Sequence, residues 1–229
     1  MSEDALPPLL LSLSGGDRRS IGRVADAVEA VLTDPALLAT LFEGMQRPDP
    51  VLRMRCADAA EKISARQPQW LLPFRDQLLN GLAADPQQEI RWHVAPMLLR
   101  LPLSTAEADR VYAILVGYTT DPSRIVRTEA MQALADLARR HPRFTDEVRR
   151  LLTALAASGT PAMQARGRRL LARLNAEVNK ALNSAAVKDS YFALGFEPSP
   201  GSPADFAAYV KKEIPKWEAV VKRSGAKME

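Results

Sequence analysis

The sequence predicts an all-α protein, an α-solenoid of stacked helical hairpins followed by a short helical extension. A motif recurs at intervals of 36 residues, and apolar residues between the motifs follow helical spacing. No alternating strand pattern appears between residues 17 and 174. A single helix pair of this length cannot bury its apolar faces, whereas stacked pairs can.

The recurring motif begins with a capping residue and a proline. "DPVLRMR" starts at Asp49, "DPQQEIR" at Asp85 and "DPSRIVR" at Asp121, and "TPAMQAR" follows at Thr160 after a spacing of 39 residues. Asp or Thr at an N-cap accepts a backbone N–H that the first helical turn leaves unpaired, and proline suits the next position. We therefore expect each motif to open a helix, as should "DPALLATLFEGM" at Asp34.

The segments between the motifs should supply the partner helices. They are "PQWLLPFRDQLLNGLAA" (68–84), "STAEADRVYAILVGY" (104–118) and "FTDEVRRLLTALAAS" (144–158). Ser104 and Glu107 have the spacing of a capping box. "RRSIGRVADAVEAVLT" (18–33) is expected to be an N-terminal capping helix, and residues 1–16 are expected to be disordered.

An arginine follows each capping residue by six positions, at Arg55, Arg91, Arg127 and Arg166. This column has two interpretations. Either the capping carboxylates Asp49, Asp85 and Asp121 neutralise these arginines, or the arginines form a basic stripe for phosphate groups. We favour the first, because an Asp accompanies three of the four arginines.

These motifs resemble the HEAT repeat family over roughly residues 34–174, so we assign 17–174 to a repeat domain. The copy "DPSRIVRTEAMQALADLARRHP" matches the family's second-helix pattern at Asp121, Val126, Arg127, Ala130, Ala133, Leu134 and Leu137. The copies at 49 and 85 depart from it at Asp58, Val94 and Pro96. The resemblance implies an Asp–Arg ladder and a concave surface that binds other proteins.

Residues 175–229 do not continue the repeat. Residues 1–174 contain 22 Arg and one Lys, whereas 175–229 contain seven Lys and one Arg. Ser202 and Pro203 should open a final helix with one apolar stripe, formed by Phe206, Val210, Ile214, Trp217 and Val221. We expect that stripe to dock on another surface, most simply on the last repeat.

This tail resembles the C-terminal end of the Bug family, the tripartite tricarboxylate transporter receptors. The matching residues are Leu174-Asn175, Ala181-Leu182, Leu194-Gly195-Phe196-Glu197-Pro198, Gly201-Ser202-Pro203, Phe206, Glu213, Trp217, Val220-Val221-Lys222 and Gly225. The resemblance implies a joining of two gene histories near Leu174. It implies no ligand site, because the family's carboxylate-binding residues lie upstream of such a tail.

No catalytic constellation is evident. The chain has no Gly-rich phosphate loop and no HExxH or GxSxG motif. Its single cysteine, Cys56, lies in an Ala-rich helical stretch, and His93 and His141 are far apart in sequence. We expect core or surface roles for all three, with no metal, no cofactor and no enzymatic activity.

The function expected from the sequence is a non-catalytic protein-interaction scaffold. Arg53, Trp92 and Arg124 are candidate partner-binding residues. They also support an alternative, a DNA-binding protein of the HEAT-like alkylpurine DNA glycosylase type, since Trp beside Arg can stack on a base. The net charge of +4 is mild and interspersed, which disfavours it. A remnant of a periplasmic carboxylate receptor is a further alternative.

The protein is expected to be cytoplasmic. The first residues are acidic where a secretory signal needs positive charge, and no apolar stretch approaches the ~20 residues of a membrane span. We expect another protein as the partner. The sequence does not specify the oligomeric state.

Overall fold

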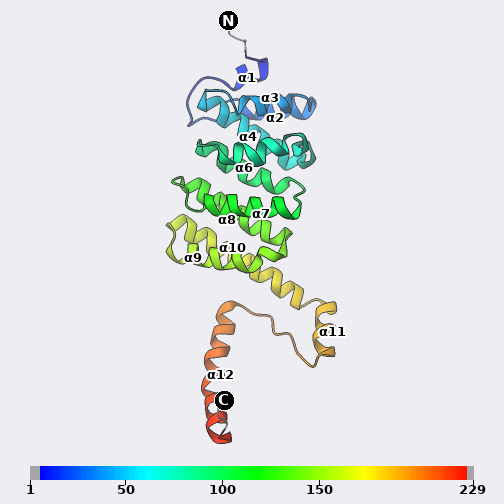
Figure 1. Ribbon diagram of the computed structural model, residues 1–229, viewed down its shortest axis with the longest axis vertical. Coiled ribbons are helices and arrows are strands. Elements are labelled where there is room, and N and C mark those ends of the chain that lie inside the picture. The colour runs from blue at the N-terminus through cyan, green and yellow to red at the C-terminus, as the bar shows by residue number, and fades with distance from the viewer. Residues whose placement is uncertain (1–5, 226–229) are drawn as a thin grey trace. The chain divides into compact units, whose positions relative to one another are not determined.

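The structure is a computed structural model that describes residues 6–225, and within them the chain is all-α with no strand (Figure 1). It contains α-helices and short 3₁₀ helices joined by brief turns. They are α1 (Pro8–Leu13), α2 (Val24–Thr33), α3 (Leu37–Gly44), α4 (Pro50–Arg66), η1 (Pro68–Phe74), α5 (Arg75–Asn80), η2 (Leu82–Ala84), α6 (Gln88–Arg100), α7 (Thr105–Tyr118), α8 (Arg124–Arg140), η3 (Pro142–Phe144), α9 (Thr145–Ser158), α10 (Pro161–Leu182), α11 (Ala185–Ala193) and α12 (Pro203–Ser224).

The chain divides into two compact units, residues 1–167 and residues 168–229. The division falls inside α10, a few residues before the junction predicted between 174 and 175. Each unit is described by itself below.

In the first unit, helices pack mainly against helices that are close in sequence. The helix α4 contacts α2, α3 and α6, and α6 in turn contacts α8. The helices α7 and α9 both pack on α8. The motif-bearing helices α4, α6 and α8 thus lie side by side, and the intervening helices cover them (Figure 1).

The core of this unit is made by the apolar stripes that the helical spacing predicted. On α4, Ala57, Ala59 and Ala60 are fully buried, so small side chains let the neighbouring helices approach closely. The hydroxyl of Tyr118 donates to the carbonyl oxygen of Ala83 at 2.6 Å, which satisfies the polar end of a buried ring.

The capping motifs start helices in two different ways. Asp49 is a true N-cap, whose Oδ1 accepts the amide of Val51 at 2.8 Å, and α4 begins at Pro50 as predicted. After Asp85 and Asp121 the helix starts later, because each carboxylate closes a turn with the amide two residues on, at Gln87 and Ser123. The predicted N-caps at those two positions were therefore wrong by two residues each.

The segment 68–84 is not one helix. It is divided into η1, α5 and η2. Pro73 lies inside η1, where it offers no amide to the preceding turn, and Gly81 follows the end of α5. The capping box of α7 is formed as expected, since Ser104 Oγ accepts the amide of Glu107 and the Glu107 carboxylate accepts that of Ser104.

The expectation of disorder in residues 1–16 was wrong for the part that the structure describes. Residues 8–13 form α1, and Leu10 and Leu13 have no exposed surface. The burial of these two leucines against α3 and α4 stabilises the helical conformation of the segment. Residues 1–5 lie outside the described residues.

The second unit contains the end of α10 together with α11 and α12. The amides of Asn175 and Asn179 both donate to the carbonyl oxygen of Gly201, at 3.1 and 3.0 Å, and Asn179 Oδ1 accepts the amide of Gly201. These bonds hold the loop before α12 to the end of α10. No residue of α11 or α12 is buried.

Candidate functional site

One arginine of the predicted column, Arg91, forms an ion pair with the capping aspartate of the next motif. Arg91 Nε donates to Asp121 Oδ2 at 2.7 Å, and its Nη1 donates to the carbonyl oxygen of Asp85 at 2.7 Å. The two paired side chains are only 13% and 8% exposed. Arg91 therefore joins the turn before α6 to the turn before α8.

The ion pair between the motif at Asp49 and the motif at Asp85 is made by a different arginine of the first motif. The guanidinium of Arg53, not that of Arg55, pairs with Asp85. Arg53 Nε also donates to the carbonyl oxygen of Met45 at 2.7 Å. The side chain of Arg53, which the sequence suggests as a partner-binding residue, is thus largely buried and makes internal bonds.

Arg55 is buried and binds the loop between α1 and α2. Its Nη1 donates to the carbonyl oxygens of Leu13 and Gly15, at 2.8 and 2.7 Å, and its Nε donates to that of Ser20 at 3.1 Å. A Cβ on Gly22, which has a φ of +56°, would lie 2.9 Å from the guanidinium carbon, so only glycine fits there. Sequence reasoning missed this role, since nothing in the motif indicates carbonyl acceptors 35 or more residues upstream.

The last two arginines of the column also depart from the predicted ladder. Arg166 pairs with Glu129 at 3.3 Å. Within residues 6–225, Arg127 has no ion pair, and its Nε is buried without a hydrogen-bond partner. The reason lies in the next motif, whose capping residue is Thr160, so that no carboxylate is available where Asp85 and Asp121 stand in earlier copies.

Arginines make several further bonds between successive helix pairs. Arg100 donates to the carbonyl oxygen of Glu61 and to Ser64 Oγ, both at 2.7 Å. Arg143 donates to the carbonyl oxygen of Thr105 at 2.7 Å. A guanidinium presents five donors in a planar fork and so can bridge two groups at once, which an ammonium on a flexible stem does less well.

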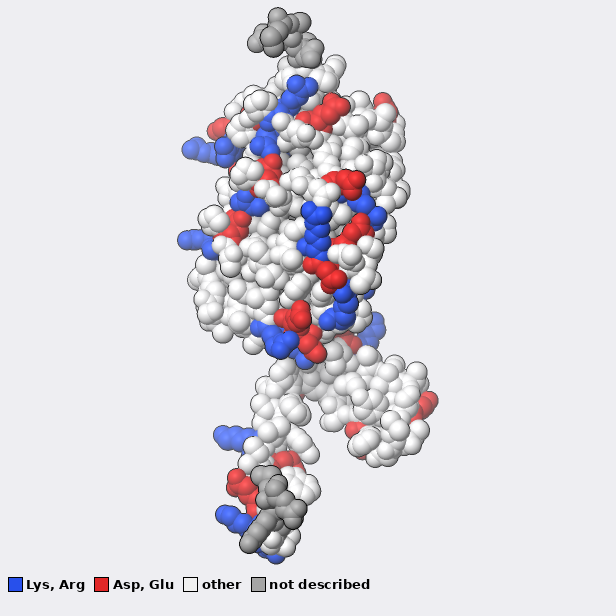
Figure 2. All heavy atoms as spheres, viewed as in Figure 1, with Lys and Arg blue, Asp and Glu red and all other residues white. Residues whose placement is uncertain are grey.

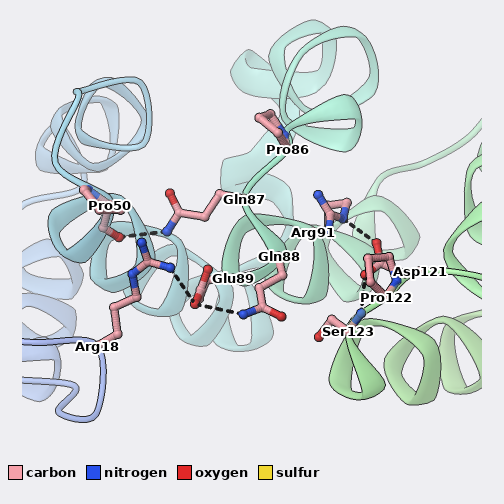
Figure 3. A pocket seen from close by; sticks show the side chains of 10 residues that line it. All are labelled: Arg18, Pro50, Pro86, Gln87, Gln88, Glu89, Arg91, Asp121, Pro122 and Ser123. Atoms are coloured by element: carbon pink, nitrogen blue, oxygen red, sulfur yellow. Dashed lines mark hydrogen bonds and ion pairs between the residues drawn. The ribbon is translucent and has the colours of Figure 1, made fainter.

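The starts of α4, α6 and α8 surround a pocket of about 560 Å³. Figure 3 shows its lining, which combines prolines with ionic and amide side chains. The lining residues are Arg18, Pro50, Pro86, Gln87, Gln88, Glu89, Arg91, Asp121, Pro122 and Ser123.

Glu89 is the unusual group of this pocket. It is 4% exposed, and its Oε2 is buried without a hydrogen-bond partner. Its Oε1 lies 3.6 Å from Arg18 Nη1, an ion pair longer than a hydrogen bond, and 3.5 Å from Gln88 Nε2 (Figure 3). The pocket thus holds a carboxylate with unused acceptor capacity beneath the half-exposed side chain of Arg18.

The other two predicted partner-binding residues, Trp92 and Arg124, lie on α6 and α8. Trp92, on α6, is partly exposed, and its ring meets that of His93 edge to face at 5.8 Å between centroids. Arg124, the first residue of α8, is exposed. A smaller pocket of about 160 Å³ lies between α6 and α8 and is lined in part by Pro96, Gln132 and Asp136.

Charges of both signs are interspersed over the first unit. On the face drawn in Figure 2, acidic and basic side chains alternate and no continuous basic patch is formed. This agrees with the pairing of Arg53, Arg91 and Arg166 with carboxylates.

The single cysteine and the two histidines lie on the motif-bearing helices or at their ends. Burial, with a smaller contribution from Asp49, raises the pKa of the Cys56 thiol to about 12, so the thiolate is scarce at neutral pH. Burial lowers the pKa of His93 from its usual value, against the opposing fields of Asp58 and Glu61. His141 is the C-cap residue of α8.

Neither a metal centre nor a membrane span is found in the part of the chain that the structure describes. No group of three or more His, Cys, Asp or Glu residues there is arranged to hold a metal ion. No helix there combines the length and the apolar character needed to cross a bilayer. Comparisons with protein-family models, with curated proteins and with solved structures gave no match. Function must therefore be argued from the geometry.

Proposed function

We propose that residues 17–174 form a HEAT-like α-solenoid that acts as a non-catalytic protein-interaction scaffold. The partner binds across the starts of α6 and α8, over the pocket that contains Glu89. The observation that carries this proposal is the buried carboxylate oxygen of Glu89, which has no donor in the described chain.

The packing of the helices supports the solenoid. The motif-bearing helices α4, α6 and α8 contact one another in sequence order, and Arg91 links one motif to the next through Asp121. Repeat proteins are stabilised by such contacts between neighbouring repeats, and they present extended surfaces for binding. Because a fold alone does not specify function, the proposal depends on the pocket rather than on the resemblance.

The chemistry of the pocket favours a partner with a basic side chain. A lysine or arginine of the partner would donate to Glu89 Oε2 and displace Arg18, whose contact with Glu89 is long and half-exposed. An ion pair formed in such a partly desolvated site is stronger than one on an open surface. The neighbouring Pro86 and Pro122 offer rigid, exposed apolar surface beside it.

The same geometry makes nucleic acid a poorer partner. Arg53 and Arg91, which a phosphate backbone would need, are already paired with carboxylates. Glu89 would repel phosphate. A DNA-binding protein should also lose affinity steeply with salt, which gives a direct measurement for this alternative.

Site-specific cross-linking in an extract of the native host tests the proposal. A photoreactive amino acid replaces Gln88, which is exposed beside the pocket, and in a control chain it replaces Thr153, which is exposed on α9. We expect a discrete protein adduct from position 88 and none from position 153. Glu89→Gln, which keeps the shape and removes the charge, should reduce the adduct.

Three outcomes would contradict the proposal. They are equal cross-linking at both positions, an adduct that Glu89→Gln leaves unchanged, and a salt-sensitive complex of the purified chain with duplex DNA. The last would favour the glycosylase-like alternative, and saturable binding of citrate would favour the carboxylate-receptor remnant.

A further inference from the structure

The helix α12 carries a long apolar face that no other described part of the second unit covers. Phe206, Ile214 and Trp217 are 69%, 54% and 57% exposed, although the sequence predicts that this stripe should dock. Tyr209, Val210, Val220 and Val221 on the same helix are also exposed. Large contiguous apolar surface of this kind marks an interaction site in a soluble domain.

The helix is well defined at both ends without help from a neighbour. Ser202 and Asp205 form a capping box, Pro203 occupies the first position, and Gly225 ends the helix with a φ of +67°. Its 22 residues span about 33 Å. Pro215 lies on the side of the helix opposite the stripe, so it leaves the apolar face uninterrupted.

Within the stripe, the indole of Trp217 is already satisfied. Its Nε1 donates to Glu213 Oε2 at 3.1 Å, and Lys216 Nζ contacts the same oxygen at 2.9 Å. The ring therefore needs no polar partner from outside, and its exposed surface is available for apolar packing.

The spacing of the stripe is nearly the same in both directions along the helix. Consider two copies of α12 related by a two-fold axis that crosses each helix at the Glu213–Ile214 bond. Phe206 of one copy then lies opposite Val221 of the other, and Val210 lies opposite Trp217. Each large side chain then faces a small one, and the two copies of Ile214 meet near the centre. We propose that α12 pairs with α12 of a second copy of this chain, in antiparallel orientation.

The charges beside the stripe fit this arrangement. At about 100° per residue, Lys211 and Glu218 lie on the same flank of the stripe. In an antiparallel pair with a two-fold axis, the same flanks of the two helices adjoin. Lys211 of each copy then lies near Glu218 of the other, so two opposite-charge pairs border the apolar seam.

The expected dimer is a weak one. A single pair of helices of this length falls at or below the ~1,200 Å² that specific interfaces usually bury. We therefore expect a dissociation constant in the micromolar range and a fast exchange between monomer and dimer.

Sedimentation velocity of the full chain over a range of concentrations tests the pairing. We expect a shift from the 25.1 kDa monomer to a species of twice that mass as concentration rises. Trp217→Glu should weaken the association by at least about 30-fold, since each dimer loses two aromatic anchors. Ala208→Glu, on the opposite side of the same helix, is the matched control and should leave it unchanged.

A charge exchange tests the orientation. Lys211→Glu alone and Glu218→Lys alone should each weaken the dimer by about 10-fold, because like charges then adjoin across the seam twice. The double variant should return to within about 3-fold of the parent chain. All these side chains are exposed, so the substitutions do not disturb a core.

The result that overturns the proposal is a chain that remains monomeric at every soluble concentration. Such a chain would point to another protein as the occupant of this face. A dimer that Trp217→Glu does not weaken, or one that the double charge exchange fails to restore, overturns it equally.

Discussion

Replacing Arg91 by alanine should destabilise the first unit by about 3 kcal/mol. The guanidinium makes two hydrogen bonds of 2.7 Å, one to the Asp121 carboxylate and one to the carbonyl oxygen of Asp85. A hydrogen bond to a charged group contributes about 1.5–3 kcal/mol, and these side chains are only 13% and 8% exposed. Asp121 Oδ1 keeps the amide of Ser123, which limits the loss.

The measurement is urea unfolding of the full chain followed by helical circular dichroism. A loss of about 3 kcal/mol corresponds to a fall in Tm of roughly 6–12 °C for a unit of this size. Arg124→Ala is the control, since that side chain is exposed, and should change stability by less than about 0.5 kcal/mol. Arg91→Lys should fall between the two, because it keeps the charge and loses the fork. Equal stability of the two alanine variants would refute the ladder at this position.

Three further outcomes follow from the structure. Gly167→Ala should destabilise by about 1–3 kcal/mol, because the new Cβ would lie 2.7 Å from that of Ala156, whereas Gly117→Ala, with nothing within 4 Å, should be neutral or stabilising; calorimetry that ranks them the other way would contradict this packing. The pKa of His93 is lowered in the folded chain, so its contribution to stability is complete above its unfolded pKa near 6.5 and is lost as the pH falls below that value. His93→Gln should therefore reduce the difference between the free energies of unfolding measured at pH 7 and at pH 5. Cys56 should react with a thiol reagent only as fast as the chain opens, and rapid reaction of the native protein would show that the thiol is not buried.

Much of the secondary structure could be predicted from local signals. The capping box at Ser104 and Glu107, the start of α4 after Asp49 and the start of α12 at Pro203 all depend on residues within one turn. Such signals are complete in the sequence, because donor and acceptor lie at most three positions apart.

The partners of the arginines could be predicted only in part. The link from Arg91 to Asp121 follows from the repeat, whereas the exchange of Arg53 for Arg55 at Asp85 does not. Which guanidinium reaches a carboxylate depends on the loop that precedes α2, and that loop offers Arg55 a set of carbonyl oxygens. A contact of this kind depends on tertiary structure, and no repeated residue pattern in the sequence indicates it.

The change from arginine to lysine along the chain has a physical counterpart. In the first unit, arginines such as Arg91 and Arg100 each donate to two residues outside their own helix. In α12, the ammonium of Lys216 instead contacts Glu213 and the ring of Trp217, both within one turn on the same helix. The arginine-rich composition therefore belongs to the unit whose turns are joined by guanidinium bonds, and the lysine-rich composition belongs to the unit of exposed helices.

The sequence-neighbour packing of α2, α4, α6 and α8 has a consequence for how the chain acquires its structure. Residues that meet in this unit are mostly about one motif apart, so closing each contact costs little loop entropy. Chains rich in such contacts fold in microseconds to milliseconds. During synthesis, α4 can pack on α2 as soon as both have emerged from the ribosome, and α6 and α8 can then add in turn to an existing surface.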